Sequence, residues 1–345
     1  MKELFTQEYK RIVRYIEIFI VIVAIAAIYN FISPASEHKT FYLSGSSSKE
    51  IAHELEKYGY TVTFIDQIFM HLGTLPKEGW YHAKDTKKSR YDFFSSLHKQ
   101  HTDVMQVVVY AGETAKELCR RLANDMKLDE KNLFEAYEAR SRFKEADIFA
   151  QHYSIARKAD AFAAMQYLFD LSNKELAAFE KEYFTQKPKL STMRILLIIA
   201  SIIQKESNSA KEMPLISSVI YNRLDKKMKL QMDCTLNYGK YSHVIVTPER
   251  IKTDNTYFNT YRYKGLPPQP LGTVTIDALR AAMMPSESKY LFFMLTPGGS
   301  HNFAVTYEEH LKNIRAFREY QKKKKTLKKR DTNQTLCVET NATKP

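Results

Sequence analysis

The first strongly apolar stretch of the chain lies near the N-terminus. Residues 18–36 contain no charged side chain, and residues 19–28 consist almost entirely of Ile, Val and Ala. A stretch of this length can cross the hydrocarbon core of a bilayer as a helix. The pattern therefore predicts a membrane-spanning helix over residues 15–35.

The flanking residues indicate how such a helix would be oriented. Lys2, Lys10, Arg11 and Arg14 precede the apolar stretch, and basic residues favour the cytoplasmic side. Residues 1–14 are then cytoplasmic, and the chain after the span is exported. A cleaved signal peptide with a small-residue site at Ser33-Pro34-Ala35 is the alternative.

A strand, turn and helix pattern occurs twice in residues 38–130, with an offset of 67 residues. In the first copy residues 41–47 lead into a helix carrying Ile51 and Leu55, and Ser47 is its predicted N-cap. In the second copy residues 108–114 do the same, and Thr114 is the predicted N-cap. The pattern resembles LysM-type glycan-binding modules, and chance similarity of two ordinary strand and helix units is the alternative.

Helical periodicity dominates after residue 131. Apolar residues recur every three or four positions in residues 132–143, 160–169 and 173–184. Ser172 and Glu175 have the spacing of a capping box, which predicts that a new helix begins there. A domain boundary is expected near residues 130–145.

The segment 191–207 predicts a helix that begins with a Ser/Thr cap and is apolar on nearly every side, which is typical of a core helix. Its spacing places Glu206 on the same face as Ile195, Ile199 and Ile202. A carboxyl group beside a buried apolar face loses hydration, and its pKa rises toward the range of a general acid. A helix that simply ends in solvent at Glu206 is the alternative.

Charge and composition exclude several classes of function. The net charge is +13, but seven of the cations lie in the run Lys322–Arg330, so the rest of the chain does not have the basic balance of a nucleic-acid-binding protein. Cys119, Cys234 and Cys337 lie far apart and predict neither a zinc site nor a disulfide framework. No HExxH and no glycine-rich phosphate-binding motif occurs, so no metal or other cofactor is expected.

The C-terminal half carries a set of ordered motifs. They are Ala200-Ser201-Ile202 with Lys205-Glu206-Ser207, Asn222-Arg223-Leu224, Leu230-Gln231 with Asp233, Thr235, Tyr238 and Gly239, Phe258-Asn259-Thr260-Tyr261 with Gly265-Leu266-Pro267-Pro268, and Tyr290-Leu291-Phe292-Phe293 with Gly298-Gly299, His301 and Phe303. In this order they resemble the membrane-anchored endolytic murein transglycosylases, the MltG or YceG-like group. Two departures are Gln204, where the family has Glu, and residues 145–149, which only partly match an aromatic family segment.

The resemblance implies cleavage of the β-1,4 bond between N-acetylmuramic acid and N-acetylglucosamine inside nascent peptidoglycan strands, with 1,6-anhydro ends as products. Glu206 matches the family's catalytic acid. The resemblance also suggests a sugar-binding role for a set of polar residues, which could instead cap loops or fill the core: Asn222, Gln231, Asp233, Tyr238, Asn259, Tyr261 and His301. Asp233 is the candidate second carboxylate if the enzyme is a hydrolase.

The sequence thus predicts an α+β chain in which the membrane helix is followed by a LysM-like region over residues 36–135. This region is followed by a mixed α+β catalytic domain over residues 136–320 and by a basic disordered tail over residues 321–345. The resemblance implies an enzyme in the bacterial cytoplasmic membrane, with its catalytic domain outside and cell-wall synthases as partners. A membrane-tethered glycan-binding or scaffold protein without activity is a further alternative.

Overall fold

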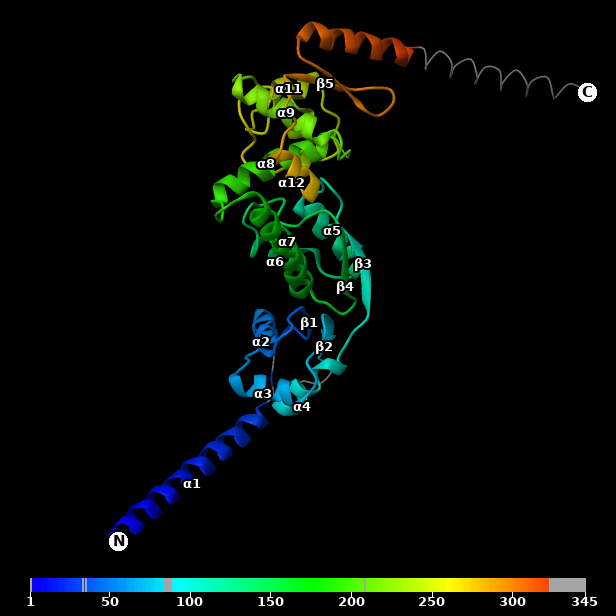
Figure 1. Cartoon of the computed structure of the whole chain (residues 1–345). Helices are drawn as coiled ribbons and strands as arrows, with labels where there is room; N and C mark the ends of the chain where they lie inside the picture. Colours follow the sequence, from blue (N-terminus) through cyan, green and yellow to red (C-terminus); the bar gives the residue numbers. More distant parts are fainter. Residues whose placement is uncertain (1, 33, 35, 84–88, 208, 323–345) are drawn as a thin grey trace, which may run out of the picture. The chain divides into compact units, whose positions relative to one another are not determined.

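The computed structural model describes residues 2–322 apart from 33, 35, 84–88 and 208 (Figure 1). The described chain is a mixed α+β structure, as predicted, and its strands form small antiparallel sheets. It forms two compact units. The N-terminal unit comprises residues 1–108, 119–140 and 152–171, and the C-terminal unit comprises residues 109–118, 141–151 and 172–345.

Helix α1 (Lys2–Phe31) begins the N-terminal unit. Its segment Gln7–Phe31 is long and apolar enough to cross a membrane. None of this segment is buried within the protein. A membrane anchor and a signal sequence both have these properties. Most of the predicted basic tail, residues 323–345, lies outside the described residues.

The predicted repeat corresponds to two strand-helix-helix-strand segments. The elements of the first are β1 (Thr40–Leu43), α2 (Ser48–Lys57), α3 (Phe64–Leu72) and β2 (Gly79–His82). Those of the second are β3 (Val104–Val108), α5 (Ala115–Met126), α6 (Glu130–Glu138) and β4 (His152–Ala156). In each segment the two strands pair antiparallel, with Thr40 opposite His82 and Val104 opposite Ala156.

The helix caps of the repeat are as predicted. Ser47 and Glu50 form a reciprocal capping box at the start of α2. Thr114 Oγ1 likewise accepts from the backbone N–H of Glu117 at 3.3 Å, and the Glu117 carboxylate accepts from the Thr114 N–H at 2.7 Å. Each box satisfies backbone donors that have no partner within the helix.

The first two strands and the helices around them enclose an aromatic core. The ring of Phe41 contacts those of Tyr58, Tyr60 and Tyr81, Tyr60 contacts Phe93, and all five residues are buried. Helix α4 (Arg90–Ser95) and the short 3₁₀ helix η1 (Leu97–Lys99) complete this region.

One predicted helix boundary is wrong. Helix α7 (Ala161–Tyr183) runs without a break through Ser172, so the expected capping box does not start a new helix. The hydroxyl of Ser172 instead accepts from the backbone N–H of Phe149 at 3.1 Å. Apolar side chains continue at helical spacing across this point, and their burial outweighs the local capping signal.

The core of the C-terminal unit is formed by three packed helices. They are α8 (Leu190–Glu206), α9 (Met213–Asp225) and α12 (Ile276–Met283). Helix α8 begins after Lys189, whose side chain makes no capping bond, so the predicted Ser/Thr cap is wrong. Pro214 lies in the first turn of α9, where a proline without an N–H costs no helical hydrogen bond.

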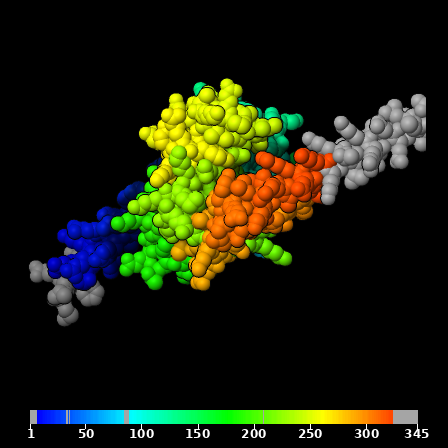
Figure 2. Space-filling view, turned by 90° about the horizontal axis from the view of Figure 1, so that it is seen from above, coloured from blue at the N-terminus to red at the C-terminus, as the bar shows by residue number. Residues whose placement is uncertain are grey.

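Shorter elements surround these helices. They are α10 (Asp233–Leu236), η2 (Gly239–Tyr241), α11 (Pro248–Thr253), β5 (Phe292–Leu295), β6 (His301–Ala304) and a helix over 307–322. Strands β5 and β6 form an antiparallel hairpin, with Leu295 opposite His301. In the space-filling view, residues after about 200 make up most of the visible surface of this unit (Figure 2).

Candidate active site

Glu206 is the last residue of α8, and the backbone becomes extended at Ser207. Ile202 and Ile199, one and two turns earlier, are buried as predicted, whereas Ile195 is 50% exposed because it lies in the first turns, beyond the edge of the core. The Glu206 side chain is half-buried, and burial raises the pKa of its carboxyl group.

The most direct partner of Glu206 is Cys234. Its thiol and its backbone N–H both hydrogen-bond the Glu206 carboxylate, which favours the charged form. The negative charge of Asp233 acts in the opposite direction, and His301 favours the charged form. The pKa of Glu206 stays above its ordinary value because burial is the largest of these effects. Cys234 is not among the residues predicted for the site, although it lies next to Asp233 in the motif.

Asp233 is an exposed residue at the start of α10. Its carboxylate accepts a hydrogen bond of 2.6 Å from the hydroxyl of Tyr261. Burial and this bond raise the pKa of Tyr261, so the phenol remains a donor. Glu206 also contributes to this shift, so these three predicted residues lie within electrostatic reach of one another.

His301 is the first residue of β6 and is held by Glu212. Its Nδ1 lies 2.7 Å from the Glu212 carboxylate, and its backbone N–H donates to the same group at 2.8 Å. Burial raises the pKa of Glu212, but the bonds from His301 outweigh it and hold this pKa below its ordinary value. Glu212 carries no signal in the sequence motifs.

Arg223 adds a buried positive charge near Glu206. Its guanidinium donates to the backbone carbonyls of Leu291, at 2.6 Å, and of Leu230. Burial lowers the pKa of Arg223, and the charge of Glu206 acts against that decrease. Arg223 therefore joins α9 to Leu291, the residue before β5, and contributes to the field at the site.

Tyr238 lies beside a second buried carboxyl group, that of Glu145. The Tyr238 hydroxyl donates to Glu145 at 3.1 Å and accepts from Gln269 at 2.5 Å. The backbone N–H of Ala115 donates to the other Glu145 oxygen at 2.7 Å. Burial raises the pKa of Glu145 to about 7. The tyrosine ring stacks on Phe258 with centroids 4.6 Å apart.

Two predicted sugar-binding asparagines support the fold. The Asn222 amide donates to the carbonyls of Ser288 and Tyr290, each at 2.9 Å. Asn259 is fully buried, and its amide donates to the carbonyls of Ile251, at 2.8 Å, and Asp254, at 2.9 Å. Contact of these residues with substrate remains a prediction.

Gln231 differs from the asparagines in being exposed, and its backbone has a φ of +51°. Its N–H donates to the carbonyl of Thr260 at 3.2 Å, which links the motif of Asp233 to that of Tyr261. A left-handed backbone is unusual for a residue with a side chain. It turns the chain immediately before Met232 and α10.

A surface hollow lies elsewhere in the unit, lined by residues of α7 and α12. It contains none of the predicted site residues. No group of three or more His, Cys, Asp or Glu side chains among the described residues could hold a metal ion.

The geometry around Glu206 suits proton transfer to and from a neutral substrate. A half-buried carboxyl with a raised pKa can donate a proton near neutral pH and then accept one. The exposed carboxylate of Asp233, the Tyr261 hydroxyl and the His301 ring supply polar groups within electrostatic reach of it.

Comparison with known proteins agrees with these features. A family described as YceG-like matches residues 43–316. An endolytic murein transglycosylase of Bacillus subtilis is 36% identical over 129 residues, which are 37% of this chain and 35% of the relative. Another from Streptococcus pneumoniae is 29% identical over 176 residues, which are 49% of this chain and 31% of the relative. The alignments thus span about a third of each relative's length.

A crystal structure of a YceG-like protein from Listeria monocytogenes has a similar fold, with a TM-score of 0.52 and 24% identity. The match covers 81% of this chain and 99% of that one. The resemblance given by the motifs is therefore confirmed at the level of the family. Because the family match extends over most of its length, the chain belongs to the YceG-like family.

Proposed function

We propose that this protein is a membrane-anchored lytic transglycosylase that cleaves the bond between N-acetylmuramic acid and N-acetylglucosamine within nascent peptidoglycan strands. The proposal follows the names of its relatives and the ordered motifs. The observation that carries it is the half-buried Glu206 carboxyl group, whose pKa is raised beside Asp233, Cys234 and His301.

Glu206 performs both proton transfers in this mechanism. It first protonates the departing glycosidic oxygen. It then accepts the proton of the muramic C6 hydroxyl as that hydroxyl attacks C1 and closes the 1,6-anhydro ring. The nucleophile is already part of the substrate, so orientation replaces a second catalytic group and no water is consumed.

The same proposal assigns roles to the rest of the chain. Helix α1 is the anchor, with residues 1–14 in the cytoplasm and the span within 15–35. The repeat-containing region of residues 36–135 is a LysM-like module that contacts glycan, and residues 136–320 are the catalytic domain. Cell-wall synthases at the membrane are the expected partners.

A two-carboxylate hydrolase is the second candidate, favoured by the proximity of Asp233 to Glu206. In that reaction Asp233 would activate a water molecule. The two reactions differ in their products, because hydrolysis leaves reducing ends whereas transglycosylation leaves anhydro ends that are one water lighter.

Mass spectrometry of glycan strands digested by the full chain in nanodiscs tests the proposal. We expect anhydro ends, and Glu206→Gln should lower turnover by at least about 100-fold, as is typical when general acid-base catalysis is lost. Reducing ends would favour the hydrolase. Binding of glycan without turnover by the unchanged protein would favour the scaffold alternative.

A further inference from the structure

Helix α3 exposes an apolar stripe. Phe64, Ile68 and Leu72 are 74%, 42% and 68% exposed, and they recur every four residues. At 100° per residue they lie within about 80° of one another on the helix. Asp66 and Met70 are both completely buried and lie on the opposite side. The stripe is therefore the outward face of α3.

The stripe is not a requirement of the fold. Helix α6 occupies the same position as α3 in the second strand-helix-helix-strand segment. Its buried residues are Leu133 and Tyr137, and its exposed residues include Glu130, Lys131, Asn132, Glu135 and Glu138. The equivalent helix thus has an ordinary polar surface, whereas α3 carries one charged residue, Asp66, and it faces inward.

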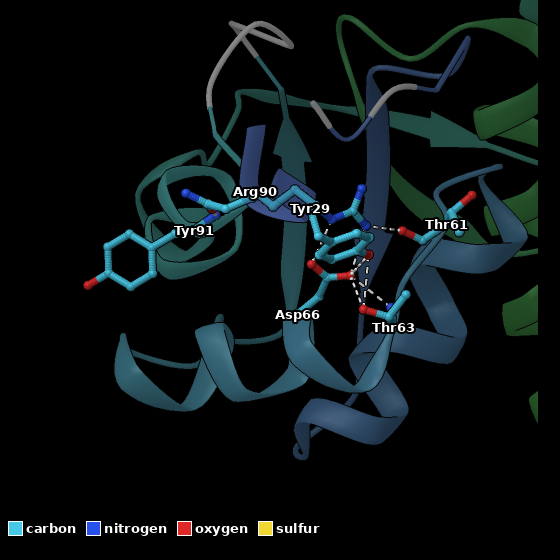
Figure 3. A network of polar contacts seen from close by, with 7 residues as sticks. Tyr29, Thr61, Thr63, Asp66, Arg90 and Tyr91 are labelled. Atoms are coloured by element: carbon cyan, nitrogen blue, oxygen red, sulfur yellow. Dashed lines mark hydrogen bonds and ion pairs between the residues drawn. The ribbon is translucent and has the colours of Figure 1, made fainter. Parts of the chain in front are cut away.

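The start of α3 is attached to the end of α1. Thr63 is the N-cap of α3 and forms a capping box with Asp66. The Tyr29 hydroxyl lies 2.9 Å from Thr63 Oγ1 and donates to Asp66 Oδ2 at 2.8 Å. Tyr29 lies in the last turn of the apolar segment that ends at Phe31. Figure 3 shows Tyr29 and Asp66 pointing toward each other.

Arg90 reinforces this junction. Its Nε and Nη2 donate to the two oxygens of Asp66, each at 2.8 Å, and Nη2 also donates to the carbonyl of Thr61 at 2.6 Å (Figure 3). Its guanidinium lies 4.4 Å from the centre of the Tyr29 ring. Both partners of the ion pair are buried, so the geometry is held by paired charges that cannot be separated without a large cost.

A second link fixes the other side of the last α1 turn. The backbone N–H of Tyr91, the second residue of α4, donates to the Asn30 side chain at 2.8 Å. Tyr91 is itself 43% exposed and packs against Phe69 of α3 with ring centroids 5.5 Å apart. The ends of α1, α3 and α4 thus form one junction, from which the apolar stripe of α3 extends.

We propose that α3 lies in the membrane interface beside α1, with Phe64, Ile68 and Leu72 inserted at the boundary between headgroups and acyl chains of the outer leaflet. The inference rests on α1 being the anchor of the proposed function. A helix with one apolar face and no exposed carboxylate suits this position. The exposed stripe then continues the apolar surface of α1, and it fixes the height of the N-terminal unit above the bilayer.

Photolabelling of the full chain in nanodiscs tests the inference. The bilayer would contain a phospholipid with a diazirine near the top of its acyl chain, and adducts would be mapped by mass spectrometry. Helix α3 falls within one tryptic peptide, residues 58–77. We expect adducts both on the segment Gln7–Phe31 and on this peptide.

Two matched variants sharpen the result. Ile68→Gln with Leu72→Gln should reduce labelling of the 58–77 peptide by about tenfold or more while leaving α1 labelled, because each lost side chain weakens partition into lipid. Val104→Gln on β3 changes an apolar residue that is about as exposed as Ile68, at 43%, and should leave all labelling unchanged.

Labelling of α1 without α3 would overturn the inference while leaving the anchor intact, and would assign the stripe to a protein partner. An absence of label on both helices would remove the anchor and the inference together. Neither result bears on Glu206, whose products are measured separately.

Discussion

The carboxyl group of Glu145 makes stability depend on pH. It is 6% exposed, and burial raises its pKa from 4.5 to about 7. Below about pH 4.5 the group is protonated in both the folded and the unfolded state and has no effect. Between these two values the unfolded chain ionises while the folded one does not, so stability falls as the pH rises.

The size of this effect follows from the two pKa values. Their difference corresponds to about 3 kcal/mol of folding free energy, because one pH unit is worth about 1.4 kcal/mol. Glu145→Gln preserves the shape of the side chain and a carbonyl oxygen for the Ala115 N–H, but it cannot ionise. The variant should therefore gain up to about 3 kcal/mol over the wild type as the pH rises past 7.

Urea unfolding of the full chain in detergent, followed by near-ultraviolet circular dichroism between about pH 5 and pH 8, measures this difference. A difference in unfolding free energy between variant and wild type that is the same at every pH reflects packing. The informative quantity is therefore the change of this difference with pH. A difference that does not change with pH would refute the assignment of a buried, protonated Glu145.

Glu117→Gln is the matched control for this experiment. Burial raises the pKa of Glu117, but hydrogen bonds from the Thr114 N–H and from neighbouring hydroxyl groups outweigh it and hold this pKa below its ordinary value. A carboxyl group of that kind contributes stability above its unfolded pKa and loses it in acid. Glu117 also pairs with the exposed His243 at 3.1 Å, and an exposed ion pair of this kind is worth at most about 1 kcal/mol. The difference between this variant and the wild type should thus change by much less than that of the Glu145 variant from about pH 5 to pH 8.

Three further predictions concern other parts of the chain. Asp233→Asn removes a like charge that raises the pKa of Glu206, so the alkaline limb of the pH-rate profile should move to lower pH, by about half a pH unit or more. In Gly272→Ala the new Cβ would lie 2.7 Å from two backbone carbonyl oxygens, and the urea midpoint of the C-terminal unit should fall, reflecting a loss of roughly 1–3 kcal/mol. Arg90→Met leaves Asp66 buried without its partner and should destabilise the N-terminal unit by about 3–5 kcal/mol, measured by hydrogen exchange of its core strands.

The parts of the fold that the sequence predicts well depend on short-range signals. The caps at Ser47 and Thr114 need only a residue three positions later, and the structure has both. The α8 core helix and the hairpin of β5 and β6 likewise follow from local periodicity and a Gly-Gly turn. Ser172 has the same local signal, but the burial of the surrounding apolar residues keeps α7 continuous.

The candidate site is less predictable because its partners come from distant segments. Glu145 is brought to Tyr238 and Ala115 across 93 and 30 residues of sequence. Glu212 and His301 are separated by 89 residues. No periodicity connects such positions. The motifs name Glu206, Asp233 and His301, but they cannot show that Cys234 hydrogen-bonds Glu206 or that Glu212 holds His301.

The departure at Gln204 bears on whether the site can be catalytic. Gln204 is buried, and its carbonyl oxygen accepts from the backbone N–H of Thr275 at 3.1 Å and from its hydroxyl at 2.7 Å. Thr275 is the N-cap of α12, so Gln204 ties α8 to that helix. It lies about 200° around α8 from Glu206, away from Asp233 and Cys234. A glutamine serves this structural contact without placing an uncompensated charge in the core, so its presence gives no reason to regard the Glu206 site as decayed.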